Sequence, residues 1–375
     1  LATMALGGSS ADTWVLGDEP LQEDTDFDHS TLAAFTPADT ELVQRERLVT
    51  SRAAENLFWL GRYTERAENT TRLARIVLQS LHGEEEPSIG HLMWIGQLAE
   101  SAGLVPDDCP SPLDDRVEFE RQLIGALGDT EDTPSVGYTL RNLRQAGSAL
   151  RERLSPEHWN FIKQAEDNFL REARRLRDDG GHGADALQQL AAVSRALSAI
   201  TGAQQDRMWR DDGWRLLSAG RQIERLTYLS EALSRGFYTN AVHDAAGFGV
   251  VLDLFDSTIS FHARYQRSRA IAALIEHVVL NFENPRSLGW VVQTLNGRLA
   301  RLHEREPGPL EDLSQRLQPP GADGLTRLCQ SDHIGDFVHL QALLQQFMKA
   351  GAQLSTDISL RHFTHTGEVR RSTGV

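Results

Sequence analysis

Several glutamates and arginines lie close together in one segment of this chain, at spacings that place them side by side on a helix. Arg62 and Glu65 are three residues apart, and Glu68 and Arg72 are four apart. Residues three or four apart are neighbours on a helix surface. A guanidinium group can hold a carboxylate or phosphate with two parallel hydrogen bonds, and a glutamate can accept a proton or anchor an amine. The segment therefore has the residue types of an anion-binding or acid–base site.

A related segment follows 159 residues later in the chain. Residues 57–66 and 216–225 are identical at five of ten positions, including the pattern Gly-Arg-x-x-Glu-Arg. Two interpretations remain open from these residues alone. Either two helices present glycine, glutamate and arginine to a shared polar cleft, or two structural helices are cross-braced by Arg–Glu ion pairs. The residues alone favour the second, because charged helix faces are usually solvated.

The helix that positions the first segment is predicted over about 51–82. Small and apolar residues recur there at spacings of three and four, the period of one buried helix face: they are Leu57, Leu60, Thr64, Ala67, Thr71, Ala74, Leu78 and Leu81. The middle of this stripe is small, and Gly61 beside it costs about 1 kcal/mol relative to alanine in a helix. A second helix is therefore expected to pack closely against this part of the chain.

Proline placement predicts the fold class of the remainder. No proline lies between Pro156 and Pro285, a gap of 128 residues, and proline breaks helix interiors. Ser155-Pro156-Glu157 and Asn284-Pro285 are predicted to start helices, and Gly180-Gly181 to end one. The alternation of β-branched residues typical of strands is almost absent. We therefore predict an all-α helical bundle of about ten helices, a single large domain with an irregular acidic N-terminal segment.

The charge of the chain excludes two classes of partner. The chain has 38 basic and 53 acidic residues, a formal charge of −15, whereas nucleic acid and anionic membranes attract basic surfaces. No apolar run approaches the ~18 residues of a membrane helix. Nothing resembles a signal peptide, and two cysteines are too few for a disulfide framework. We expect a cytoplasmic protein that binds neither nucleic acid nor membrane.

The acidic residues are concentrated near the N-terminus. The first 50 residues hold ten acids and two bases, and a segment of this kind buries too little apolar surface to offset its ordering entropy. We predict an acidic linker over 17–48 and a disordered tail over 366–375.

No metal centre is expected. A ferritin-like two-metal site needs Glu-x-x-His pairs on two helices, and the sequence contains no such pair. The chain also has only two lysines, Lys163 and Lys349, and no phosphate-binding loop of the Gly-x-x-x-x-Gly-Lys type. Cationic side chains at a site must therefore be arginines, which do not donate a proton at neutral pH.

The first segment belongs to a longer motif that resembles a known family. Residues 51–72, SRAAENLFWLGRYTERAENTTR, closely resemble the opening signature of the bacterial alpha-E domain. Later blocks fit in the same order: residues 135–155 followed by Trp159, then 210–225, 265–267 and 284–288. The resemblance spans about 49–365, which we take as the helical domain. It also raises the Gly-Arg-x-x-Glu-Arg repeat above chance and favours the interpretation as a functional cleft.

Residues 1–16 resemble a second family, the C-terminal end of a circularly permuted ATP-grasp domain, which is often fused to or encoded beside the alpha-E domain. That family usually has lysine where Ala11 stands, which argues against an ATP contact at that position. Together the two resemblances imply an ATP-dependent carboxylate–amine ligase. Mg-ATP would bind the ATP-grasp domain, with no cofactor in this chain. The implied partners are that ligase, fused or separate, and a transglutaminase-like or peptidase protein.

The resemblance gives the polar residues expected roles. The helical domain would be the acceptor-binding or accessory part of peptide or amide bond formation. Glu65 and Glu224 would hold or deprotonate the attacking amine. A substrate carboxylate or acyl phosphate would be bound by a second set of residues: Asn56, Arg62, Arg66, Asp212, Arg221, Arg225 and Arg286.

A non-catalytic scaffold that docks the ligase and its partners is the alternative. It predicts that Arg62, Glu65, Arg221 and Glu224 pair with one another and leave no open pocket. Whether the domain itself takes part in catalysis stays open at this point.

Overall fold

The computed structural model describes residues 49–83, 86–178, 182–305, 311–321, 324–331 and 336–363. Every regular element in these ranges is helical, which confirms the all-α prediction. They contain thirteen α-helices rather than about ten, and two of these, α10 and α12, have only five residues each. The segments predicted over 1–16, 17–48 and 366–375 lie outside the described residues.

The helices follow one another with these bounds: α1 Ser51–Leu81, α2 Ile89–Ser101, α3 Arg116–Ala126, α4 Val136–Ser148, α5 Pro156–Asp178, α6 Gly183–Asp206, α7 Asp212–Tyr238, α8 Ala245–Leu254, α9 Thr258–Tyr265, α10 Ile271–Ile275, α11 Leu288–His303, α12 Gly324–Leu328 and α13 Val338–His362. A π-helical turn over Glu276–Leu280 follows α10. None of the described helices combines the length and apolar character needed to cross a membrane.

The predicted helix starts have different outcomes. α5 begins at Pro156 as predicted, and the Ser155 hydroxyl accepts a hydrogen bond from the His158 backbone N–H at 3.1 Å. The start predicted at Asn284-Pro285 is wrong. The Asn284 carbonyl and side chain instead accept hydrogen bonds from the Ser287 and Arg286 backbone N–H groups, which forms a turn. α11 therefore begins three residues after the proline, with Ser287 as its N-cap.

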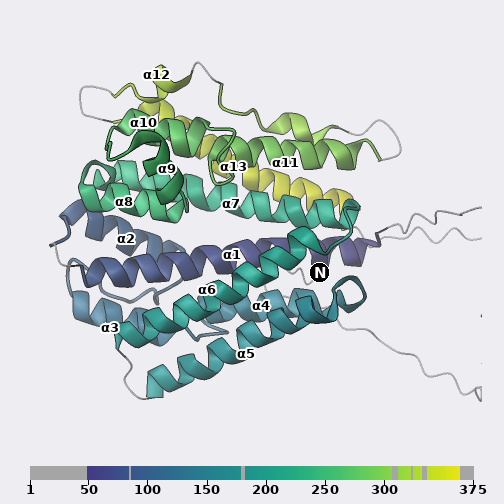
Figure 1. Ribbon diagram of the computed structural model, residues 1–375, viewed down its shortest axis with the longest axis horizontal. Helices are drawn as coiled ribbons and strands as arrows, with labels where there is room; N and C mark the ends of the chain where they lie inside the picture. The colour runs from purple at the N-terminus through teal and green to yellow at the C-terminus, as the bar shows by residue number, and fades with distance from the viewer. Residues whose placement is uncertain are drawn as a thin grey trace, which may run out of the picture. The chain divides into compact units, whose positions relative to one another are not determined.

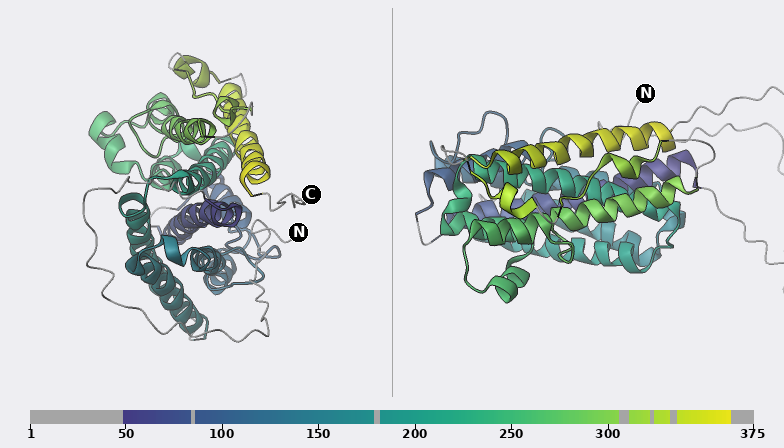
Figure 2. Two further views of the ribbon diagram at one scale, coloured as in Figure 1. Left: turned by 90° about the vertical axis from the view of Figure 1, so that its right-hand side faces the viewer. Right: turned by 90° about the horizontal axis from the view of Figure 1, so that it is seen from above.

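The long helices lie side by side in an elongated bundle with α1 at its centre (Figure 1). α1 packs against α7, α4 and α6, and α7 in turn packs against α13 and α11. The end-on view in Figure 2 shows α1 surrounded by these neighbours, with α5 outside α4 and α6. The predicted helix over 51–82 is thus the central element of the fold.

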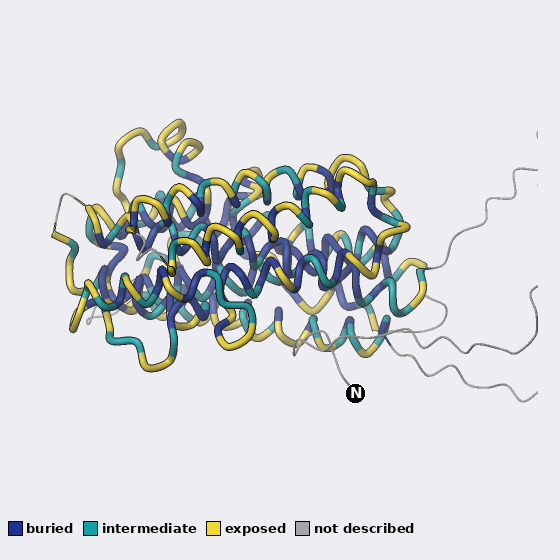
Figure 3. The backbone as a smooth tube through the Cα atoms, turned by 90° about the horizontal axis from the view of Figure 1, so that it is seen from below, coloured by how far each residue is buried: buried dark blue, intermediate teal, exposed yellow. Residues whose placement is uncertain are grey.

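α1 is buried on most of its surface, and not only along the predicted stripe. All eight stripe residues are buried, as expected. Glu65, however, is 0% exposed and Asn69 is also buried, although both lie off the stripe. Figure 3 shows the buried backbone running along the middle of the bundle. Glu65 and Asn69 therefore lie inside the bundle and not on a solvated face.

The close approach expected at Gly61 occurs, and it is reciprocal. A Cβ atom on Gly61 would lie 2.0 Å from the Leu217 carbonyl oxygen, and one on Gly220 would lie 2.3 Å from the Phe58 carbonyl oxygen. Gly61 and Gly220 are equivalent positions of the sequence repeat, as are Phe58 and Leu217. α1 and α7 therefore run parallel and in register, with the two repeat segments related by a local two-fold arrangement.

Candidate functional site

Glu65 of α1 is enclosed by three arginines. Arg225 of α7 donates to both carboxylate oxygens, from Nε to Oε1 at 2.7 Å and from Nη2 to Oε2 at 2.8 Å. Arg221, one turn earlier, donates to Oε2 at 3.0 Å, and Arg286 before α11 donates to Oε1 at 3.3 Å. A buried carboxylate is tolerated when charged hydrogen bonds satisfy it in this way. Glu65 therefore ties α7 and the start of α11 to α1.

Glu224 of α7 is held by the equivalent residues of α1. Arg66 donates from Nε to Oε1 at 2.7 Å and from Nη2 to Oε2 at 3.0 Å, and Arg62 donates from Nε to Oε2 at 2.8 Å. Each helix thus supplies two arginines to the glutamate of the other. The spacing suggested pairs within α1, whereas the arginines and glutamates of the repeat pair between the helices.

Both repeat glutamates are held in their charged form. Burial favours the neutral carboxyl group, but the charges of Arg225, Arg221 and Arg286 outweigh it and keep the pKa of Glu65 well below its ordinary value. In the same way, burial is outweighed by Arg66 and Arg62, which lower the pKa of Glu224 to about 2. A carboxylate with so low a pKa is a weak base at neutral pH.

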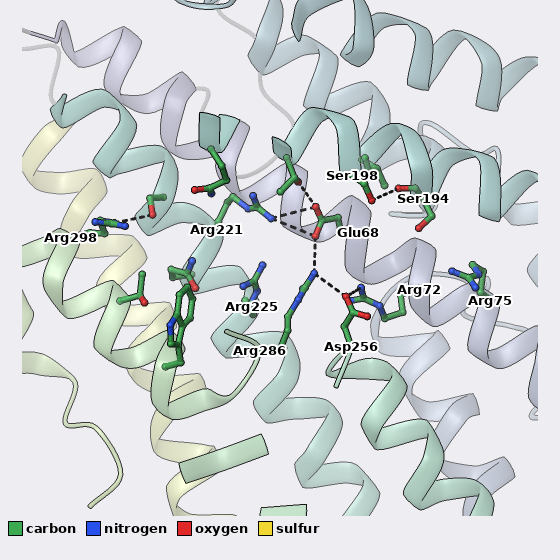
Figure 4. Close-up of a pocket in the computed structure, with 17 residues that line it drawn as sticks. Glu68, Arg72, Arg75, Ser194, Ser198, Arg221, Arg225, Asp256, Arg286 and Arg298 are labelled. Carbon is green, nitrogen blue, oxygen red and sulfur yellow. Dashed lines mark hydrogen bonds and ion pairs between the residues drawn. The ribbon is translucent and has the colours of Figure 1, made fainter. Parts of the chain in front are cut away.

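A cavity of about 480 Å³ lies on the Glu65 side of the α1–α7 pair (Figure 4). Six arginines and two carboxylates line it, together with hydroxyl groups of α6 and Trp290 of α11. The charged residues are Arg72, Arg75, Arg221, Arg225, Arg286, Arg298, Glu68 and Asp256. The cavity is therefore lined mainly by positive charge in a chain whose net charge is −15.

Glu68, and not Glu65, is the α1 glutamate that lines this cavity. Its side chain is 11% exposed, and its oxygens accept from Arg221 and Arg286 at 3.4 Å each and from the Thr201 hydroxyl. These contacts to arginine are longer than those of Glu65, which lies behind the arginines. Glu68 therefore keeps some capacity to accept a hydrogen bond from a bound molecule.

The structure brings part of the predicted site together. Arg221, Arg225 and Arg286 line the cavity, and Glu65 lies directly behind them. Arg62, Arg66 and Glu224 form the second cluster and do not line the cavity; the Arg62 guanidinium also donates to Ser355 of α13 at 2.7 Å.

Two predicted residues lie apart from both clusters. The Asn56 side chain donates to the Arg52 carbonyl at 2.9 Å within α1. Asp212 begins α7 and pairs with Arg215 at 2.7 Å. Neither Asn56 nor Asp212 lines the cavity. Their side chains serve the ends of the helices to which they belong.

Several residues that line the cavity are not among the site residues predicted from the sequence. Glu68 and Arg72 stand out by their helical spacing but are not assigned to the site from it, and Arg75 continues the same spacing one turn further along α1. Asp256 and Arg298 come from other elements, and only the packing of the loop after α8 and of α11 brings them to the cavity.

No group of three or more histidine, cysteine, aspartate or glutamate residues in the described ranges is arranged to hold a metal ion. The donor set of the cavity agrees with that finding, because guanidinium groups repel cations and bind anions. The expectation that the chain holds no metal stays a prediction.

An all-helical bundle whose central helices exchange Glu–Arg pairs beside an arginine-lined cavity defines the class of this protein. The chain belongs to the Alpha-E family, described as a predicted alpha-helical domain with a conserved ER motif, whose model matches residues 49–363. The dipeptides Glu65-Arg66 and Glu224-Arg225 supply four charges of the two clusters.

The chain is also similar to uncharacterized proteins of Mycobacterium tuberculosis and Mycobacterium bovis. Each is 26% identical over 271 residues, which is 67% of this chain and 30% of the relative. The chain thus covers less than a third of the length of these relatives. No solved structure matches the chain.

Proposed function

We propose that the helical domain holds the acceptor substrate of an ATP-dependent carboxylate–amine ligase, and that the arginine-lined cavity receives an anionic group of that substrate. The observation that carries this proposal is the excess of six arginines over two carboxylates around one cavity in an acidic chain. Guanidinium groups are suited to carboxylates and phosphates, and a cavity of this volume accommodates a small molecule.

The roles of the residues follow from where their side chains lie. Arginine stays charged at neutral pH, so Arg72, Arg75 and Arg298 would bind and orient oxyanions but would not transfer protons. Glu68 would accept a hydrogen bond from the amine of the bound molecule. Glu65 and Glu224 would act as positioning residues, because each is already saturated by arginine and has a low pKa.

The chemical step would be completed by a partner. A circularly permuted ATP-grasp ligase, implied by the resemblance of residues 1–16, would bind Mg-ATP and form the acyl phosphate. This chain would present the attacking amine in a fixed orientation, and orientation alone supplies a large part of the rate in such reactions. A cytoplasmic location and a transglutaminase-like or peptidase partner belong to the same proposal.

The scaffold hypothesis is favoured by one observation. Arg62, Glu65, Arg221 and Glu224 pair with one another, as that hypothesis predicts. It also predicts that no open pocket remains, whereas Arg221 lines a cavity. The cavity is therefore the feature that favours ligand binding over a purely structural role.

The test is a ligation assay with the full chain, a circularly permuted ATP-grasp ligase, Mg-ATP and a mixture of amino acids. ADP release and product mass are followed. We expect Arg75→Gln to lower the rate at limiting amino acid at least tenfold, a loss of about 1.4 kcal/mol in transition-state stabilisation.

Arg235→Gln on α7 is the matched control. Arg235 pairs with Glu231 at a half-exposed position and does not line the cavity. Its replacement should leave the rate unchanged. Equal rates for the wild type and Arg75→Gln would favour the scaffold, and the absence of any amide product with the wild type would reject the ligase proposal.

A further inference from the structure

We propose that the arginine-lined cavity takes a molecule with two anionic groups, one at each end of the cavity. This inference rests on the proposed function and names the class of its substrate: a compound with two carboxylates, or with a carboxylate and a phosphate. Positive charge in the cavity is compensated at its middle and uncompensated at its two ends.

The middle of the cavity is close to neutral. Arg221, Arg225 and Arg286 lie here, and the carboxylates of Glu65 and Glu68 contact them at 2.7 to 3.4 Å. Arg286 also lies 3.6 Å from Asp256. Three guanidinium groups thus share the carboxylates of Glu65 and Glu68, with Asp256 shared between Arg286 and Arg72. An additional anion placed here gains little, because each guanidinium already has a counter-charge.

One end of the cavity has positive charge in excess. Arg75 of α1 makes no hydrogen bond or ion pair with any residue that the structure describes. Arg72, one turn earlier, pairs with Asp256 at 2.9 Å through Nη2, but its buried Nη1 has no hydrogen-bond partner. A buried donor without a partner is costly, and a ligand oxygen would satisfy it. Hydroxyl groups of Ser194 and Ser198 line the same cavity.

The opposite end has a second uncompensated guanidinium. Arg298 of α11 donates to the Ser218 hydroxyl at 3.2 Å and stacks on the Trp214 ring at 4.6 Å. Within the described residues it pairs with no carboxylate. Burial and the charges of Arg210, Arg215 and Arg301 lower its pKa, which reflects a local surplus of positive charge.

These two ends are well separated. In Figure 4, Arg298 and Arg75 lie on opposite sides of the cavity, with Arg225 and Arg286 between them. A single carboxylate can pair with one end only. A molecule with an anionic group at each of its own ends would neutralise the positive charge at both ends of the cavity. Its uncharged middle would lie beside Arg225 and Arg286, whose charges are already compensated. The arrangement therefore favours such a molecule over a singly charged one.

Straight-chain dicarboxylates from malonate to sebacate measure the distance between the two anion-binding ends of the cavity. Their binding to the full chain is measured by calorimetry and compared with that of monocarboxylates of the same length. We expect one chain length to bind at least tenfold more tightly than its monocarboxylate. Arg75→Gln and Arg298→Gln should each lower the affinity for that dicarboxylate to the affinity for the monocarboxylate. Arg235→Gln should leave the affinity for the dicarboxylate unchanged.

The outcomes distinguish failure of the two-anion inference from failure of the proposed function. Suppose that monocarboxylates bind the wild type, that Arg75→Gln or Arg298→Gln lowers their affinity, and that a second carboxylate raises the affinity at no chain length. The two-anion inference is then wrong, whereas the proposed anion site stands. If no carboxylate binds the wild type, the two-anion inference and the proposed anion site both fail. The variants are expected to fold, because neither arginine forms an ion pair among the described residues, and thermal unfolding checks this.

Discussion

Glu65 illustrates how a charge can be essential to structure without being accessible to substrate. It is 0% exposed, and three arginines satisfy both of its oxygens. A well-satisfied buried ion pair contributes little net stability compared with an apolar contact, but removal of one partner leaves the others buried and unpaired. Loss of Glu65 would leave Arg225, Arg221 and Arg286 without their shared counter-charge.

We therefore expect Glu65→Gln to lower the free energy of unfolding by about 3–5 kcal/mol. The matched control is Glu231→Gln on α7, which removes a half-exposed pair with Arg235 and should cost about 0.5 kcal/mol. Urea unfolding followed by circular dichroism measures both. A loss below about 1 kcal/mol for Glu65→Gln would contradict the structural role assigned to this carboxylate.

Glu224 predicts an acid dependence of stability. Its pKa is about 2 in the folded protein and near 4.5 ordinarily, so the ionised form stabilises the fold. This contribution, about 3 kcal/mol, is fully present above pH 4.5 and is lost as the pH falls towards 2. Unfolding in urea between pH 5.5 and 3 should show a decline that is shallower in Glu224→Gln. Identical slopes in the two proteins would refute the assignment.

At the scale of single residues, the sequence predicted the site in part. The repeat identified every arginine and glutamate of both clusters except Arg286, because equivalent positions on paired helices meet. It could not separate Glu65 from Glu68, since both point away from the apolar stripe of α1. Which of them faces the cavity depends on where α7 and Arg286 lie, and no local pattern contains that information.

At the scale of elements, the parallel pair of α1 and α7 determines where the charges meet. Gly61 and Gly220 allow each backbone to approach the carbonyl of the other helix, which brings both sets of guanidiniums within reach of the opposite glutamate. The prediction of α1 succeeded because its apolar period is long and uninterrupted. The start of α11 was missed because Asn284 and Ser287 use their side chains in a turn and a cap.

Gly61→Ala should separate the two helices. The new Cβ would meet the Leu217 carbonyl oxygen at 2.0 Å, and rigid backbone cannot move aside as a side chain can. We expect a loss of about 1–3 kcal/mol despite the better helix propensity of alanine. Gly297→Ala in α11 is the control, because nothing lies within 4 Å of its Cβ position, and it should gain up to ~1 kcal/mol.

Thermal and urea unfolding of Gly61→Ala and Gly297→Ala compare the two sites directly. Equal effects of the same sign would show that the close approach of α1 and α7 is not needed for the fold.

At the scale of the whole molecule, the contrast in charge is the main feature. The chain carries a net charge of −15, which repels anions in general, yet one cavity gathers six arginines. The fold class and the central helix could be predicted from proline placement and periodicity. The cavity could not, because α1, α6, α7, α11 and the loop after α8 each contribute to it, and their packing is set by contacts distant in sequence.

Binding of a dicarboxylate at the cavity arginines can be observed residue by residue. Nitrogen-15 resonances of the arginine Nε groups are followed while the dicarboxylate that binds most tightly in the length series is added to the full chain. We expect saturable shifts for Arg75 and Arg298, and none for Arg235 on the surface of α7. Shifts that are uniform among exposed arginines and do not saturate, or no shift at Arg75 and Arg298, would contradict binding of the dicarboxylate at the cavity arginines.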